Sequence, residues 1–247
     1  MVRKAWLAAI CLSLVTPRAA EAADVTLVRV EKLAEQYVGA QILIEIYSKA
    51  GFTVEIVPLP AARAAQMAID GDVDGGVDGR TLSYAAEDSY YPTMIKVEPP
   101  YYSVTTTAFA RRSRGLSIRS NADLKPYRVG IILAATDTNA QAVGAREIVN
   151  VPNAYLLFKM LEEGSIDIAL DAKLDGEYLI RTQRLNDLAP VGDLAKLDVF
   201  NYLTPNNESL ARRIGETIAA FKGAGLLDDL VQKYERALLE GGVRPEL

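Results

Sequence analysis

The chain has 247 residues, with 27 lysine and arginine side chains against 32 aspartate and glutamate side chains, and no histidine. Its formal net charge of −5 argues against a general nucleic-acid binder, because neutralising phosphates requires clustered basic residues. The one basic cluster, residues 111–114, is more simply a solvated turn. The lack of histidine excludes histidine-based catalytic triads and ordinary zinc sites.

The first 22 residues have the pattern of a secretory signal peptide. Arg3 and Lys4 precede the apolar run 5–15, and residues 20–22 (AEA) have the small-x-small form of a signal-peptidase site. The run is shorter than the roughly twenty residues that span a bilayer. The single cysteine, Cys11, lies inside it rather than at its end, where a lipoprotein signal would place it. We therefore predict export to the periplasm and a mature chain without thiol nucleophiles or disulfides.

Strands and helices alternate through the first part of the mature chain. The expected order is strand 25–30, helix 35–50 ended by Gly51, strand 52–57, helix 61–69 after Pro58 and Pro60, and strand 73–77. This βαβαβ order predicts a parallel sheet.

The alternation then repeats without a long linker. The expected elements are strands 104–110 and 127–133, helix 154–163 ended by Gly164, strands 166–170 and 198–203, and helices 208–222 and 226–239. Two α/β units in one short chain predict two lobes joined by extended crossings. In such sheets, ligands bind at the carboxyl ends of the strands.

Residues 70–80 (DGDVDGGVDGR) allow two interpretations. Asp70, Asp72 and Asp74 occupy the first, third and fifth ligand positions of an EF-hand loop, and Gly75 occupies its sharp turn. The twelfth position requires a bidentate glutamate, and the chain has Thr81 there. We therefore favour a helix end followed by a strand that leads to a binding cleft, and expect neither a metal nor a cofactor.

Five segments carry a resemblance to a known family. They are 59–63 (LPAAR) with 69–75 (IDGDVDG), 91–92 (YP) with 97–102 (VEPPYY), 123–125 (DLK) before 127–130 (YRVG), 161–171 (LEEGSIDIALD), and 210–234. In this order and spacing the chain resembles the type II periplasmic solute-binding proteins of ABC importers, in the branch (solute-binding protein family 3) that includes amino-acid binders. The resemblance covers nearly all of the mature chain.

The resemblance implies an α/β fold of two lobes, each a mostly parallel sheet flanked by helices, joined by two crossing strands. Lobe 1 would comprise residues 23–108 plus 204–247, and lobe 2 residues 109–203. The implied function is capture of a small polar solute by hinge closure and delivery to the membrane permease of an ABC importer. We expect a monomer that binds no nucleic acid.

The resemblance also places residues at the cleft. Asp78 and Arg80 would line it in lobe 1, and the planar guanidinium of Arg80 could grip a carboxylate or neutralise a nearby aspartate. Arg63 would face the cleft from a helix start or lie on a solvated face. Thr136 follows a strand of lobe 2, where relatives bind an anionic group at a helix N-terminus. Asp171 matches the acid that pairs with a ligand ammonium, and could alternatively cap a helix.

Two further residues complete the expected site. Tyr102 lies near the first crossing and could stack on a solute, and Glu31 follows the first strand. The usual run of serine and threonine before the arginine is absent, so the solute can be amino-acid-like or a carboxylate. Two alternatives stay open: an enzyme, such as a dehydratase or wall-cleaving lyase, that uses Glu31, Asp78 and Asp171, or a solute sensor for a membrane receptor.

Overall fold

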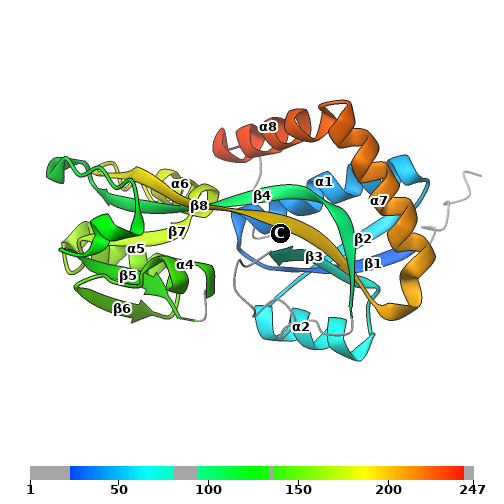
Figure 1. Cartoon of the computed structure of the whole chain (residues 1–247), viewed down its shortest axis with the longest axis horizontal. Coiled ribbons are helices and arrows are strands. Elements are labelled where there is room, and N and C mark those ends of the chain that lie inside the picture. The colour runs from blue at the N-terminus through cyan, green and yellow to red at the C-terminus, as the bar shows by residue number, and fades with distance from the viewer. Residues whose placement is uncertain (1–22, 81–93, 134–135, 242–247) are drawn as a thin grey trace, which may run out of the picture.

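The computed structural model describes residues 23–80, 94–133 and 136–241, with the side chains of residues 78–80 and 136–137 left out of the description. The signal-peptide prediction falls on residues outside these ranges. The described chain forms one eight-stranded sheet in the order β2-β1-β3-β8-β4-β7-β5-β6 (Figure 1). Two long strands in the middle of this order separate two groups of parallel strands.

Lobe 1 contains the first group of parallel strands. β1 pairs in parallel with β2 on one side and with β3 on the other, as the βαβαβ pattern predicts. Two C-terminal helices complete the lobe. Its elements are β1 (Val25–Val30), α1 (Ala34–Ala50), β2 (Val54–Leu59), α2 (Ala61–Asp70), β3 (Gly75–Arg80), α7 (Glu208–Gly223) and α8 (Leu226–Leu239).

Lobe 2 contains the second group. β5 pairs in parallel with β6 and with β7. Its elements are β5 (Arg128–Ile132), α4 (Thr136–Gln141), β6 (Glu147–Val151), α5 (Ala154–Glu163), β7 (Ile168–Ala172) and α6 (Lys173–Thr182). Three short 3₁₀ helices, η1 (Arg112–Arg114), η2 (Asn121–Leu124) and η3 (Pro205–Asn207), lie in the connections.

β4 (Ile95–Arg111) and β8 (Leu188–Leu203) are the crossing strands that the sequence leads us to expect. They pair with each other in antiparallel fashion from Ile95 opposite Leu203 to Arg111 opposite Leu188. β8 also pairs with β3 of lobe 1, and β4 pairs with β7 of lobe 2. The sheet is therefore continuous between the lobes (Figure 1).

Helices cover both faces of each half of the sheet (Figure 1). In lobe 1, α1, α7 and α8 pack on one face around Ile42, Ile46 and Ile214, and α2 covers the other face. In lobe 2, α5 packs on one face with Phe158, which meets Phe109 edge-to-face at 5.2 Å, and α4 covers the other. No helix in the described ranges is both long and apolar enough to cross a membrane.

The carboxyl ends of the parallel strands of the two lobes point toward each other. β3 is antiparallel to β8, and β7 is antiparallel to β4. Because β4 and β8 run in opposite directions, β3 and β7 also run in opposite directions. The end of β3 lies level with Tyr102 of β4, and the end of β7 lies level with Thr106. Four residues of strand separate these levels, or about 14 Å along β4.

Several elements differ from the sequence expectation, among them the crossing strands, which are longer than the expected 104–110 and 198–203. β2 continues through Pro58 to Leu59. This is possible because β2 is an edge strand, where the N–H that proline lacks is not needed for pairing with a second strand. β3 begins at Gly75 and includes Asp78 and Arg80, which we expected to follow the strand. β6 was not expected, because the largely exposed sequence EIVNV lacks the apolar run of a central strand.

Candidate functional site

At the carboxyl end of β1, an arginine is buried inside the protein. Arg29 is 4% exposed, donates from Nη1 to the carbonyl oxygen of Val30 (3.2 Å), and lies 5.9 Å from the ring centre of Tyr37 in α1. Burial lowers the pKa of the Arg29 guanidinium, and the nearby Tyr37 and Glu31 oppose that shift. Glu31 follows the strand directly and pairs with Lys32 at 3.4 Å.

The other predicted residues of lobe 1 also lie at strand ends. Arg63 is exposed in the first turn of α2, just beyond the end of β2. Arg80 is the last residue of β3, where its backbone lies opposite Val199 of β8. The side chains of Asp78 and Arg80 are outside the described part of the structure. Their assignment to a solute stays a prediction from the sequence.

In lobe 2, Asp171 occupies the carboxyl end of β7, facing lobe 1. Its side chain is 7% exposed, and its Oδ1 accepts from the amide of Ala172 at 2.9 Å. α6 begins at Lys173, and its N-cap residue, Ala172, makes no side-chain hydrogen bond to the helix. Asp171 is therefore not the helix cap of the alternative interpretation. Thr136 is the first residue of α4, beyond the end of β5, and its side chain is not described.

Tyr102 is placed differently from the other predicted residues. Its side chain is 7% exposed, and its hydroxyl donates to Glu235 Oε1 of α8 at 3.0 Å. Burial raises the pKa of the Tyr102 hydroxyl, and the charge of Glu235 adds to that shift. Tyr102 thus faces the layer of α1 and α8 rather than the strand ends, and we assign it a structural role.

Replacing Tyr102 by phenylalanine tests this assignment. We expect Tyr102→Phe to destabilise the protein by about 1–2 kcal/mol, because half-buried Glu235 loses its hydroxyl donor. The melting temperature should fall by roughly 3–6 °C, with solute affinity unchanged. Tyr155→Phe, at an exposed position of α5, is the control in a thermal melt. A large loss of affinity at an unchanged melting temperature would return Tyr102 to the binding site.

A cavity of about 300 Å³ lies on this side of the crossing strands. Its lining comes from both lobes and includes the charged residues Glu35, Lys173, Glu177, Lys196 and Glu235 together with Tyr102. Burial raises the pKa values of Glu177 and Glu235, and the charge of Glu235 raises that of Glu177 further. Lys173 opposes both shifts, although its Nζ is paired with Asp193 at 3.0 Å.

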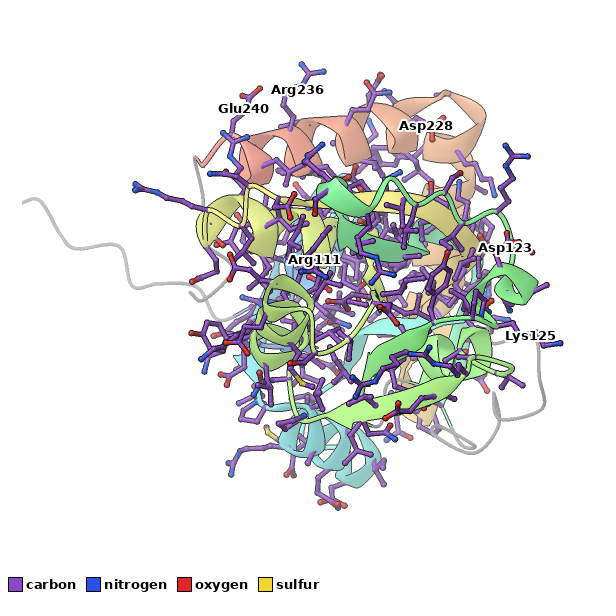
Figure 2. All side chains as sticks on the ribbon, turned by 90° about the vertical axis from the view of Figure 1, so that its left-hand side faces the viewer. Arg111, Asp123, Lys125, Asp228, Arg236 and Glu240 are labelled. Atoms are coloured by element: carbon purple, nitrogen blue, oxygen red, sulfur yellow. The ribbon has the colours of Figure 1, made fainter. Side chains whose placement is uncertain are left out.

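This cavity gives stability a specific pH dependence. Because the native state raises the pKa of Glu235, this group's contribution to stability is complete below the ordinary glutamate range and is lost as the pH rises through the raised value. Glu235→Gln has no carboxyl group to ionise and therefore avoids this loss of stability. The melting temperature of the variant minus that of wild type should therefore rise by about 1–3 °C between about pH 4 and pH 8. The control Glu240→Gln changes an exposed side chain directly after the end of α8 (Figure 2), and its melting temperature relative to wild type should not change with pH.

Asp70 and Asp74 of the aspartate-rich segment serve the fold. α2 ends at Asp70, and Gly71 adopts the left-handed conformation that closes it (φ 76°). Asp74 Oδ2 accepts from the amide of Thr26 at 2.8 Å, and Asn207 donates to Asp74 Oδ1 at 3.2 Å. A helix end followed by a strand is confirmed, with the strand beginning at Gly75 rather than at residue 73. Among the described side chains, no group of three or more acidic, histidine or cysteine residues is placed to hold a metal ion.

Two features near the strand ends were missed from the sequence. Arg29 lies on the same face of β1 as the buried residues Val25 and Leu27. An arginine in line with two buried apolar residues could therefore have indicated a buried charge at the end of this strand. Asp175 of α6 accepts hydrogen bonds from the amides of Ala34 and Glu35 at the start of α1. Nothing in the sequence pairs residues so far apart.

No protein-family model matches this sequence, and no curated protein matches it. Solved structures do match over most of the chain. A histidine kinase sensor domain with similarity to periplasmic binding proteins has a TM-score of 0.68 and 20% identity, covering 85% of this chain and 96% of its own. An amino acid ABC transporter substrate-binding protein, AbpA from Streptococcus pneumoniae bound to L-arginine, has a TM-score of 0.67 and 17% identity, covering 87% and 95%.

A third match is the GluR0 ligand-binding core in complex with L-glutamate, with a TM-score of 0.71 and 12% identity, covering 88% of this chain and 99% of the other. The chain has the type II periplasmic-binding-protein fold. The two-lobed architecture predicted from the sequence is therefore confirmed. The facing strand ends carry Arg80 in lobe 1 and Asp171 in lobe 2.

Proposed function

We propose that this protein is an extracytoplasmic solute-binding protein that captures a small polar solute, amino-acid-like or carboxylate, between its two lobes. The observation that carries the proposal is the facing arrangement of strand ends, with Asp171 buried at the end of β7 and Arg80 at the end of β3. A carboxylate and a guanidinium on opposite sides of a gap suit a zwitterion. Two of the similar structures hold L-arginine and L-glutamate.

The mechanism is hinge closure. Solute that contacts both lobes stabilises the closed form, because only that form makes contacts from both sides. The lobes are residues 23–108 plus 204–247 and residues 109–203. The chain passes between them in β4 and β8, whose crossing segments near 103–110 and 198–203 absorb the motion. The closed monomer in the periplasm, after removal of residues 1–22, then delivers the solute to a membrane permease.

A thermal-shift screen against amino acids, organic acids, amines and calcium tests the proposal. A ligand at one hundred times its dissociation constant stabilises the native state by about 2.7 kcal/mol. For a chain of this size the melting temperature should then rise by roughly 5–10 °C with at least one amino acid or carboxylate. A response to calcium alone, or to none of these compounds, contradicts the proposal.

A sensor role is the second candidate, because one of the similar structures is a histidine kinase sensor domain. Uptake of the identified solute by cells lacking this protein separates the two roles: an importer component is needed for uptake, and a sensor is needed only for the cellular response. The three similar structures are a sensor domain, a substrate-binding protein and a ligand-binding core, which supports binding over the carboxylate-dependent enzyme. Turnover of the bound solute would favour the enzyme.

A further inference from the structure

The cavity of about 300 Å³ beside the crossing strands is separate from the predicted solute site. α6 of lobe 2 contacts α1 and α8 of lobe 1, and all three helices contribute residues to the walls of this cavity beside β4 (Figure 1). Asp171, at the end of β7, is not among the described residues that line it. The volume lies at the lower end of the range found for small-molecule sites.

Two carboxylates from opposite lobes line this cavity, and neither forms an ion pair within the described part of the chain. Glu177 comes from α6 and Glu235 from α8, and both side chains are half-buried. Lys173, one turn before Glu177 on α6, binds Asp193 at 3.0 Å instead. Lys196, the other lysine of the lining, is exposed to solvent. Because a half-buried charge without a counter-ion is costly, a cation between the two carboxylates would be stabilised.

The rest of the lining indicates which kind of cation fits. Val104, Leu174 and Val231 provide an apolar surface in the same cavity as the two glutamates. An alkyl chain gains free energy when it covers such a surface, and an ammonium group has three N–H donors for carboxylate oxygens. A bare metal ion fits less well, because no three acidic residues among the described side chains are placed to ligate one.

We propose that this cavity is a second binding site, which takes a small alkylammonium ion. The ammonium group binds between Glu177 of lobe 2 and Glu235 of lobe 1, and the alkyl chain lies on Leu174 and Val231. The Tyr102 hydroxyl, which donates to Glu235 Oε1 at 3.0 Å, holds that carboxylate in place. The site goes beyond the proposed solute capture, because its ligand binds beside the helices rather than at the facing strand ends.

Isothermal titration with n-butylammonium chloride tests the site, with n-butanol as the uncharged probe of equal chain length. We expect saturable binding of the amine and none of the alcohol. Glu177→Gln and Glu235→Gln keep the size of each side chain without its charge, and each should weaken amine binding roughly tenfold. Glu240→Gln, at an exposed position after α8 (Figure 2), should bind the amine as wild type does. No amine binding, equal binding of the alcohol, or wild-type affinity in both cavity variants overturns the site.

The second site and the proposed function fail separately. Asp171→Ala should bind the amine with wild-type affinity, and a loss as large as that in Glu235→Gln would place the amine at the strand ends and overturn the second site. Amine binding that depends on Glu177 and Glu235 supports the second site even when the solute screen finds no amino acid or carboxylate ligand. Binding of an amino acid without any binding of n-butylammonium overturns the second site and leaves solute capture intact.

Discussion

Replacing Asp171 by alanine is expected to weaken solute binding by about 100-fold, the largest effect on binding that we foresee. Asp171 is buried at the end of β7, where its carboxylate can meet the ammonium group of a solute held between the lobes. Truncating one partner of a desolvated charge pair costs about 2–5 kcal/mol, because the remaining charge stays unpaired. Isothermal titration with the solute found in the thermal screen measures the change.

The control for this prediction is Asp187→Ala. Asp187 is an exposed carboxylate of the same lobe, but it binds Ser113 at the opposite end of the crossing strands. Its loss should leave the affinity within about twofold of wild type, inside the range of ordinary surface changes. An Asp171→Ala protein that folds and binds as tightly as Asp187→Ala would remove Asp171 from the site.

The second large effect concerns stability. We expect Gly75→Ala to destabilise the protein by about 2–4 kcal/mol, because β3 lies between β1 and β8 at this position. A Cβ atom on Gly75 would lie 2.1 Å from the carbonyl oxygen of Tyr202 and 2.9 Å from Leu203 Cδ2. Since backbone atoms cannot move aside as a flexible side chain can, the two strands must separate. The melting temperature should fall by roughly 5–12 °C.

The adjacent glycine provides the control. A Cβ atom on Gly76 has its nearest neighbour, the carbonyl oxygen of Val28, at 3.9 Å, which is an ordinary contact. Gly76→Ala should therefore change the free energy of unfolding by less than about 1 kcal/mol in a chemical denaturation measurement. Equal stabilities for the two variants would show that β3 is not held between β1 and β8 in the way described.

The parts of the fold that local sequence determines were predictable. Apolar spacing and a glycine in the left-handed conformation define the helices that end before Gly51 and Gly164, and both were predicted at or within one residue of their limits. The parallel pairing of β1, β2 and β3 followed from their alternation with helices. The full length of the crossing strands was not predictable, because their ends are fixed by pairing with strands distant in the sequence.

The candidate site shows the same division between local and distant information. Asp171 and Arg80 could be placed at strand ends from the sequence, because the end of a strand is a local property, and their contact with a solute stays a prediction. Tyr102 was expected near the cleft from its place on the first crossing, but the direction of its side chain depends on the packing of α8 and Glu235. The cap that Asp175 provides for α1 depends on how the two lobes dock. The sequence of a single strand or helix does not determine that docking.

The central claim is that one solute binds between the facing strand ends of both lobes. Hydrogen exchange of the purified protein, with and without the solute from the thermal screen, tests it most directly. We expect simultaneous protection of the amides after β1 and at the start of α2 in lobe 1, and of those at the end of β7 in lobe 2. Protection confined to one lobe, or to the cavity lined by Tyr102 and Glu235, would contradict the account.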